Sequence, residues 1–259
     1  MPFAPLPDGQ IHYRFDGQQD LPVLLLSHSL GADLSMWDAQ VPAFTRHFRV
    51  LRYDSHGHGA STFVAGGFNM GSLGQSVVGL LDHLGIAAVS FCGLSVGGLI
   101  GQWLALNAAN RVRKIVLCNT AARIGTADGW NARIDAINKD GLASLSTGIL
   151  DRWFTPGFRE RKPRTVDRFR KILEATPAES YRSTCSAIRD TDMRGEVSRI
   201  GAPTLVIAGT QDLATPPEDG RYLADRIVAS KYVELDTAHL SNVELPIRFS
   251  EEVLEFLGS

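Results

Sequence analysis

Short, almost uninterrupted runs of apolar residues are the feature that most constrains the fold of this chain. Strands covered on both faces read this way, and such strands are typical of parallel sheets. Helix-length segments separate the runs, and this alternation predicts an α/β fold with a mainly parallel central sheet flanked by helices. The predicted strands are 10–15, 23–27, 49–53, 88–92, 112–118, 203–208 and 231–235, and the predicted helices are 36–46, 71–84, 97–109, 217–229 and 246–257.

The alternation stops over residues 120–195, a segment that we call the lid. Its apolar residues recur at helical spacing and no clear strand is visible, which predicts a helical insertion between two strands of the sheet. The lid carries 14 Lys and Arg against 10 Asp and Glu, whereas the remainder carries 12 against 18. We therefore expect a core in two parts, 1–119 and 196–259, beneath a basic helical lid. A solvated helical surface rich in arginine would show the same charge.

Composition narrows the class of protein. The chain has 259 residues, 44% of them hydrophobic, and a net charge of −2, which argues against a nucleic-acid-binding surface. Neither a run long enough to span a membrane nor a secretory signal is visible. Three cysteines cannot all pair, and no cluster has metal-ligand spacing. We expect a cytoplasmic protein with reduced thiols, no metal and no other cofactor.

One serine, Ser95, is enclosed by glycines in the stretch FCGLSVGG, between a predicted strand and a predicted helix. A nucleophile elbow requires this context, because its turn is so tight that the neighbouring positions must lack side chains. The turn lifts the serine hydroxyl above the sheet. A glycine-rich junction that merely packs tightly is the alternative interpretation of the same pattern.

The partners of such a serine are expected downstream, an acid first and then a histidine, each following a strand. Asp212 follows the predicted strand 203–208, and His239 follows 231–235. Since open α/β sheets collect their chemistry at the carboxyl ends of the strands, we predict the catalytic set Ser95, Asp212 and His239. Asp236 is the competing acid, but it lies only three residues from His239.

Two backbone N–H groups are predicted to form an oxyanion hole. One belongs to Val96, directly after the serine, and the other to Leu30 in the loop SHSLGADLSMWD that follows strand 23–27. The glycine-punctuated loop YDSHGHGAS is assigned a structural role, in which Asp54 orients loops beneath the site.

Together these residues resemble the α/β-hydrolase superfamily, and more closely the 3-oxoadipate enol-lactonases of the β-ketoadipate pathway. The stretches that carry the resemblance are SHSLGADLSMWD, FCGLSVGGLIGQWLA, CNTAARIGTADGWNARI, DRWFTPGFRER, CSAIRDTD and PTLVIAGTQDLATPP. They cover both the core and the lid. Two positions depart from the pattern: His56 stands where relatives commonly carry arginine, and His28 where they often carry asparagine.

The resemblance implies hydrolysis of 3-oxoadipate enol-lactone, a small anionic lactone, to 3-oxoadipate in the breakdown of aromatic compounds. A carboxylate on the substrate needs a counter-charge in a mostly apolar pocket. Arg133 is the first candidate, with Trp130 and Trp153 as pocket walls; an ordinary lid core and a surface ion pair are the alternatives for these residues.

Other functions share the same residues. A general carboxylesterase and a carbon–carbon bond hydrolase would use the same three side chains on another substrate. A non-enzymatic receptor for a small molecule would reuse the fold without turnover. A haloalkane dehalogenase is disfavoured because its chemistry needs a carboxylate where Ser95 stands.

Overall fold

The computed structural model describes residues 2–62 and 67–258. Its strands form one eight-stranded sheet in the order β1-β2-β4-β3-β5-β6-β7-β8. The pairs from β4 through β8 are parallel, whereas β1–β2 and β2–β4 are antiparallel. The strands are β1 (Phe3–Leu6), β2 (Gly9–Asp16), β3 (Val23–Ser27), β4 (Arg49–Tyr53), β5 (Val89–Leu94), β6 (Val112–Cys118), β7 (Thr204–Gly209) and β8 (Ser230–Leu235).

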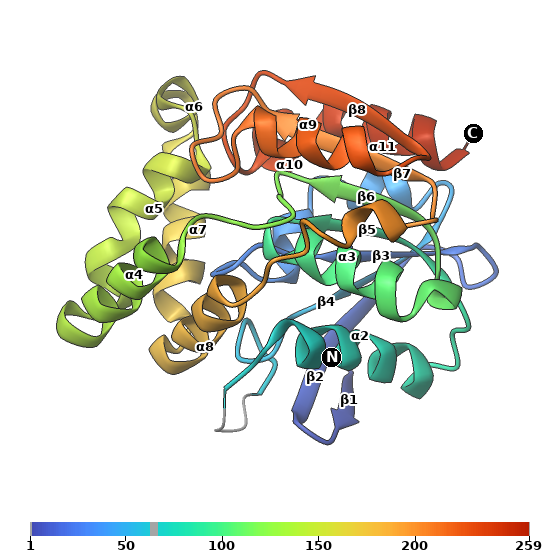
Figure 1. Ribbon diagram of the computed structural model, residues 1–259, viewed down its shortest axis with the longest axis horizontal. Coiled ribbons are helices and arrows are strands. Elements are labelled where there is room, and N and C mark those ends of the chain that lie inside the picture. Colours follow the sequence, from blue (N-terminus) through green and yellow to red (C-terminus); the bar gives the residue numbers. More distant parts are fainter. Residues whose placement is uncertain (1, 63–66, 259) are drawn as a thin grey trace.

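Helices flank this sheet, so the predicted fold class is confirmed (Figure 1). Helix α3 packs on β5 and β6, α9 packs on β7 and β8, and α1 packs on α11. The helices of the core are α1 (Val41–Phe44), α2 (Met70–His83), α3 (Val96–Asn107), α9 (Pro217–Arg226), α10 (Ser241–Glu244) and α11 (Pro246–Gly258). No described helix is long and apolar enough to cross a membrane.

Between β6 and β7 the chain forms the helices of the lid, which gather at the left of Figure 1. They are α4 (Ala127–Asp140), α5 (Ser146–Trp153), α6 (Pro156–Arg161), α7 (Pro163–Ala175) and α8 (Ala178–Arg189). Within the lid α4 packs on α8 and α5 packs on α7.

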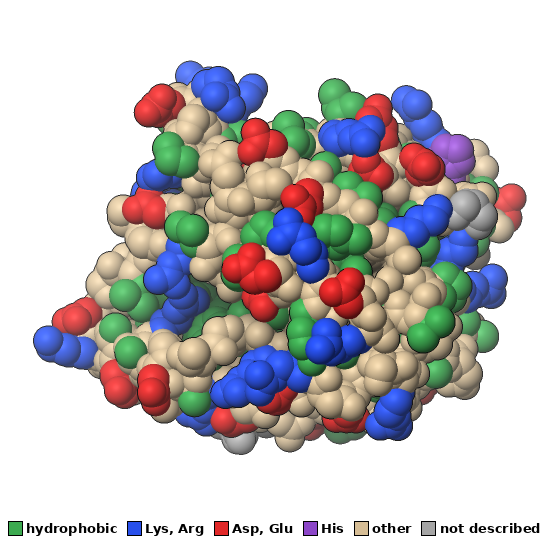
Figure 2. Space-filling view, turned by 45° about the horizontal axis from the view of Figure 1, so that its top comes forward, with side chains coloured by type: hydrophobic (Ala, Val, Ile, Leu, Met, Phe, Trp, Pro, Cys, Tyr) green, Lys and Arg blue, Asp and Glu red, His purple; other side chains and the backbone are tan. Residues whose placement is uncertain are grey.

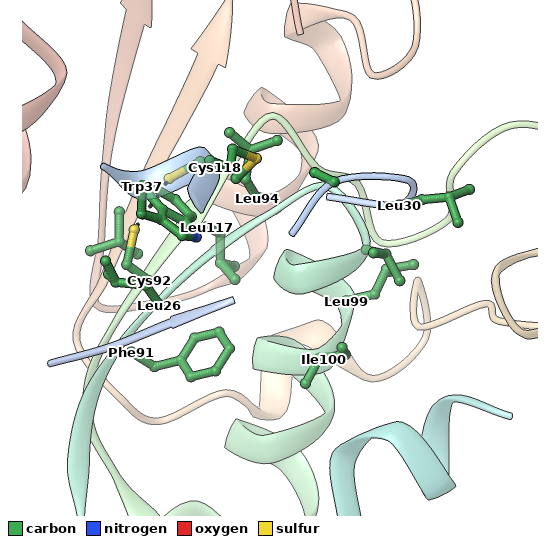
Figure 3. Packing of buried hydrophobic residues seen from close by; sticks show 14 of the residues in the cluster. Leu26, Leu30, Trp37, Phe91, Cys92, Leu94, Leu99, Ile100, Leu117 and Cys118 are labelled. Atoms are coloured by element: carbon green, nitrogen blue, oxygen red, sulfur yellow. Dashed lines mark hydrogen bonds between the residues drawn. The ribbon is translucent and has the colours of Figure 1, made fainter. Parts of the chain in front are cut away.

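The buried core fills both sides of the central strands. All six residues of β7 are buried, which explains why this strand reads as a continuous apolar run. On β5 successive side chains alternate: Figure 3 shows Phe91 on the side of α3 and Cys92 on the opposite side, toward Trp37. The ring of Phe91 lies so close to α3 that a Cβ atom at Gly101 would come within 2.7 Å of it.

Two parts of the sequence prediction need correction. The segment 36–46 is not one helix but a 3-10 turn, Leu34–Trp37, followed by the short α1. Pro42 lies in the first turn of α1, and a helix running through that position from residue 36 would lose a hydrogen bond and meet the proline ring. Strand β1 was not predicted. Its four residues include Pro5 and it forms an edge, where proline is tolerated.

Candidate active site

Ser95 occupies a sharp turn between the end of β5 and the start of α3. Its backbone has φ 60° and ψ −117°, an unusual conformation for a residue with a side chain. A Cβ atom on Gly93 would lie 2.2 Å from the carbonyl oxygen of Gly97, and one on Gly97 would lie 2.3 Å from that of Ser27. A Cβ atom on Gly98 would lie 2.6 Å from Thr120. The three glycines are therefore required by the close approach of neighbouring backbone and of the Thr120 side chain around Ser95.

Asp212 and His239 come together at the carboxyl edge of the sheet, from the loops after β7 and β8. His239 Nδ1 lies 2.7 Å from Asp212 Oδ2, and both side chains are buried. Because a carboxylate only accepts, Nδ1 carries the ring hydrogen and Nε2 is left as an acceptor. Asp236, the competing acid, is instead exposed and accepts hydrogen bonds from Thr210 and Gln211.

Further donors surround the carboxylate of Asp212. Oδ1 accepts from the backbone N–H of Ala214 at 2.8 Å and of Thr215 at 3.1 Å. Oδ2 also accepts from Thr215 Oγ1 at 2.8 Å and from Asn119 Nδ2 at 3.0 Å. Burial by itself would raise the pKa of Asp212, but the charge of His239 and these hydrogen bonds outweigh it and leave the pKa below its ordinary value. The carboxylate is therefore ionised and fixed in one orientation.

Asn119 was not predicted from the sequence, although it directly follows β6. Its backbone lies in the left-handed region with φ 44°. Besides Asp212, its amide nitrogen reaches the carbonyl oxygen of Ala238 at 3.2 Å, and its oxygen accepts a hydrogen bond from Ser241 Oγ at 2.5 Å. Asn119 thus joins the ends of β6 and β7 to the loop that carries His239. The rule that placed Asp212 and His239, a polar residue that follows a predicted strand, would have found it too.

The loop after β3 brings the candidate oxyanion donor Leu30 to the same place as the serine. Ser29 and Leu30 line one cavity together with Ser95 and His239, and no described residue accepts a hydrogen bond from the Leu30 N–H. Val96 is the first residue of α3, so its N–H has no acceptor within the helix. Both predicted donors therefore belong to the turns that enclose the serine.

His28 fixes the peptide that carries the Leu30 N–H. Its Nε2 lies 2.9 Å from the backbone N–H of Ser55 and must accept, so its Nδ1 donates to the Ser29 carbonyl oxygen at 2.7 Å. The Ser29 carbonyl and the Leu30 N–H belong to one trans peptide and point in opposite directions. Holding the carbonyl toward the imidazole therefore directs the N–H away from it.

Asp54 has the structural surroundings expected of it. Its carboxylate accepts from the backbone N–H groups of Leu34 at 2.7 Å and Ala60 at 2.9 Å, and lies 2.6 Å from His12 Nδ1. These contacts tie the loop after β3, which contains Ser29 and Leu30, to the loop after β4.

The cavity over Ser95 has a volume of about 560 Å³ and is bounded by the lid. Trp130 and Arg133 of α4 and Trp153 of α5 line it, so the structure places all three predicted lid residues at its wall. Arg152 and Tyr181 line it as well and were not predicted. On the left of Figure 2 a hollow with a hydrophobic floor has Lys or Arg side chains at its edge.

The cavity wall is cationic. It contains Arg133 and Arg152 but no Asp or Glu, and neither arginine forms an ion pair with a carboxylate among the described residues. By contrast Arg159, Arg168 and Arg189, elsewhere on the lid, are paired with carboxylates. The cavity therefore offers uncompensated positive charge to whatever enters it.

Arg133 is held in place by aromatic neighbours. Its guanidinium carbon lies 4.8 Å from the centre of the Trp130 ring. Burial raises the pKa of Tyr181, which lines the same cavity, above its ordinary value, although the charges of Arg133 and Arg152 oppose the rise. The hydroxyl of Tyr181 therefore stays protonated.

The family model described as "alpha/beta hydrolase fold" matches residues 22–246. The chain belongs to the α/β-hydrolase family. The resemblance on which the sequence interpretation relied is therefore confirmed at this level, as is the expected class of enzyme, a hydrolase.

Two members of the α/β-hydrolase family are similar to this chain over nearly its full length. It is 43% identical to 3-oxoadipate enol-lactonase 2 of Acinetobacter baylyi over 246 residues, which are 95% of this chain and 92% of that protein. The crystal structure of the enol-lactonase from Burkholderia xenovorans LB400 superposes with a TM-score of 0.98 at 45% identity and covers all of both chains.

Proposed function

We propose that this protein is a serine hydrolase that opens the lactone ring of 3-oxoadipate enol-lactone to give 3-oxoadipate, in the cytoplasmic breakdown of aromatic compounds. The observation that carries the proposal is one cavity that Ser95 and His239 line together with two arginines, neither of which pairs with a carboxylate in the part of the chain that the structure describes. The names of the similar enol-lactonases supply the identity of the lactone.

The reaction begins with attack of Ser95 Oγ on the lactone carbonyl carbon. His239 Nε2 accepts the hydroxyl proton, and Asp212 stabilises the imidazolium that forms and keeps the ring hydrogen on Nδ1. The carbonyl oxygen becomes an oxyanion, which the N–H groups of Leu30 and Val96 stabilise. The strained turn fixes the backbone from which the Ser95 hydroxyl projects into the cavity.

The tetrahedral intermediate collapses by breaking the bond to the ring oxygen. That oxygen leaves as an enol after taking the proton from His239, and the acyl group remains on Ser95. An enol is a better leaving group than an ordinary alkoxide, and its conversion to the ketone removes the nucleophile that could close the ring again. Water, deprotonated by His239, then hydrolyses the acyl-serine and restores the hydroxyl of Ser95.

Arg133 and Arg152 account for the acetate arm of this lactone. A carboxylate entering an apolar cavity must recover its lost hydration, and hydrogen bonds from guanidinium groups do this well. Trp130 and Trp153 supply flat apolar walls for the unsaturated ring. We propose a small anionic lactone as the natural ligand and neither nucleic acid nor membrane as a partner.

The test compares the turnover of two substrates. One is enzymatically generated enol-lactone, whose disappearance is measured by the loss of its absorbance, and the other is a neutral p-nitrophenyl ester. We expect a much higher kcat/KM for the lactone, repeated turnovers, and complete loss of both activities in Ser95→Ala with the fold retained. A preference for the neutral ester would indicate a carboxylesterase. Release of one equivalent of product without further turnover would indicate a receptor. Activity retained in Ser95→Ala would refute the mechanism.

A further inference from the structure

Glu244, at the end of α10, accepts hydrogen bonds from two segments that are distant in the sequence. Its Oε1 accepts from the backbone N–H of Ala238 at 2.9 Å and from that of Thr155 at 3.1 Å. Its Oε2 accepts from Thr155 Oγ1 at 2.6 Å. Ala238 immediately precedes His239, and Thr155 lies in the lid at the start of α6. One carboxylate therefore joins the lid to the loop of the candidate catalytic histidine.

The same loop contacts the lid through its next two N–H groups. His239 N donates to the Arg152 carbonyl oxygen at 3.4 Å, and Leu240 N donates to the Trp153 carbonyl oxygen at 3.0 Å. Three consecutive N–H groups, 238 to 240, thus bind lid residues 152–155, the first of them through Glu244. The side chains of Arg152 and Trp153 line the cavity.

We propose that Glu244 is a positioning residue for catalysis, which holds the main chain of His239 in register with the lid segment that carries Arg152 and Trp153. The histidine and the cavity wall then move as one unit, so the base meets the ester carbonyl at the place where the lid holds the substrate. This inference rests on the proposed role of Ser95, Asp212 and His239.

The carboxylate is suited to this role because its partners are N–H and O–H donors alone. No described Lys, Arg or His forms an ion pair with Glu244, so its negative charge is balanced by the donors that it positions. Ala238 is buried, and its N–H would be left without an acceptor if the carboxylate were removed. The loop would then relax toward other donors and acceptors and shift the imidazole with it.

The experiment uses the full chain and measures how fast a fluorophosphonate probe modifies Ser95, because this rate reports activation of the serine whatever the natural substrate is. The variants are Glu244→Gln and Glu244→Ala. Glu251→Gln is the matched control, since Glu251 is an exposed glutamate of α11 whose one ion pair within the described part of the chain is with Arg248, at 3.8 Å. Melting temperatures, together with kcat and KM for a p-nitrophenyl ester, are measured alongside.

We expect the labelling rate to fall about 10-fold in Glu244→Gln and further in Glu244→Ala, because a small displacement of a catalytic group is costly. The value of kcat should fall in parallel while KM changes by less than about 2-fold, since the cavity wall keeps its side chains. Glu251→Gln should match the unaltered protein. Labelling within about 2-fold of the unaltered rate in Glu244→Gln would overturn the proposal, whatever happens to the melting temperature.

Thr155 gives an independent arm of the test that does not depend on Glu244→Ala folding. Thr155→Val removes the hydroxyl that binds Glu244, whereas Thr155→Ser keeps it together with its bond to the Phe158 N–H. We expect slower labelling in the valine variant only, and no further loss when it is combined with Glu244→Gln. Additive losses would overturn the coupling.

Failure of the proposed function gives a different result. An unaltered protein that the probe does not label would refute the catalytic role of Ser95 itself. Labelling without turnover of the enol-lactone would refute only the substrate, and the comparison among Glu244 variants would stand.

Discussion

His58 makes acid destabilisation of this protein predictable from one side chain. It is only 1% exposed, and its Nδ1 donates to the His56 carbonyl oxygen at 3.1 Å. Its Nε2 is buried and has no hydrogen-bond partner among the described residues. Burial, followed by the charge of the neighbouring His28, lowers the pKa of His58 from 6.5 to about 3. A proton on Nε2 would create a buried cation with nothing to accept its hydrogen bond.

The sign and size of the effect follow from linkage. A histidine whose pKa is lower in the folded chain than in the unfolded chain binds fewer protons when folded, so the free energy of unfolding decreases as the pH is lowered from the unfolded pKa to the folded one. For His58 this window runs from pH 6.5 to about 3. Each pH unit is worth about 1.4 kcal/mol, and moving from pH 7 to pH 4.5 therefore costs about 3 kcal/mol through this residue.

The assay is urea unfolding at pH 7 and pH 4.5 for the unaltered chain, His58→Asn and His83→Asn. Asparagine can still donate to the His56 carbonyl but does not titrate, whereas His83 is exposed on α2 and serves as the control. We expect the acid-induced loss to be smaller by about 3 kcal/mol in His58→Asn and unchanged in His83→Asn. The lowered pKa of Asp212 also removes stability as the pH falls, but equally in all three proteins. Equal losses in His58→Asn and the unaltered chain would refute the reasoning.

Two further predictions concern the cavity and the oxyanion turn. Arg133→Ala should raise KM for the anionic lactone by about 10- to 100-fold and for a neutral ester by far less, because a charge-assisted hydrogen bond is worth about 1.5–3 kcal/mol; equal effects in steady-state assays would assign Arg133 a structural role. His28→Ala should lower kcat at least about 10-fold for both substrates with little change in KM, because the Ser29–Leu30 peptide loses the hydrogen bond that orients it. An unchanged kcat would show that this peptide keeps its orientation without the hydrogen bond from His28.

The sheet and the carboxyl-edge residues could be predicted because they depend on local pattern and on one topological rule. Apolar runs located β2 to β8, and the rule that parallel strands share a carboxyl edge brought Asp212 and His239 to one place. Segment 36–46 was predicted wrongly as one helix, because Pro42 allows a helix to start near it but not to run through it. The strand β1 was overlooked because a four-residue edge strand has too few positions to show alternation.

The lid was less predictable, because which of its side chains face the cavity depends on how its helices pack. Arg133 and Trp130 were chosen from one helix, and both line the cavity. Trp153 of α5 was predicted and lines the cavity too, but its neighbour Arg152 and Tyr181 of α8 were not, because nothing in the local sequence distinguishes them from the other arginines and polar residues of the lid. The hydrogen bonds from Asn119 to the Ala238 carbonyl and from the Thr155 N–H to Glu244 are longer-range still, because they span 119 and 89 residues of sequence.

The packing of Gly31 against the lid limits which lids from other hydrolases of this fold this chain could accept. Gly31 adopts φ 75°, and a Cβ atom there would lie 2.5 Å from Leu173 of α7 and 2.9 Å from Tyr181 of α8. The turn at Gly31, next to the candidate oxyanion donor Leu30, thus packs tightly against lid helices α7 and α8. A chimera that receives a foreign lid with bulkier side chains at these positions would displace the Leu30 N–H while leaving Ser95, Asp212 and His239 untouched. Exchanging the lid of this protein therefore calls for matched changes in residues 28–34, which contact it at Gly31.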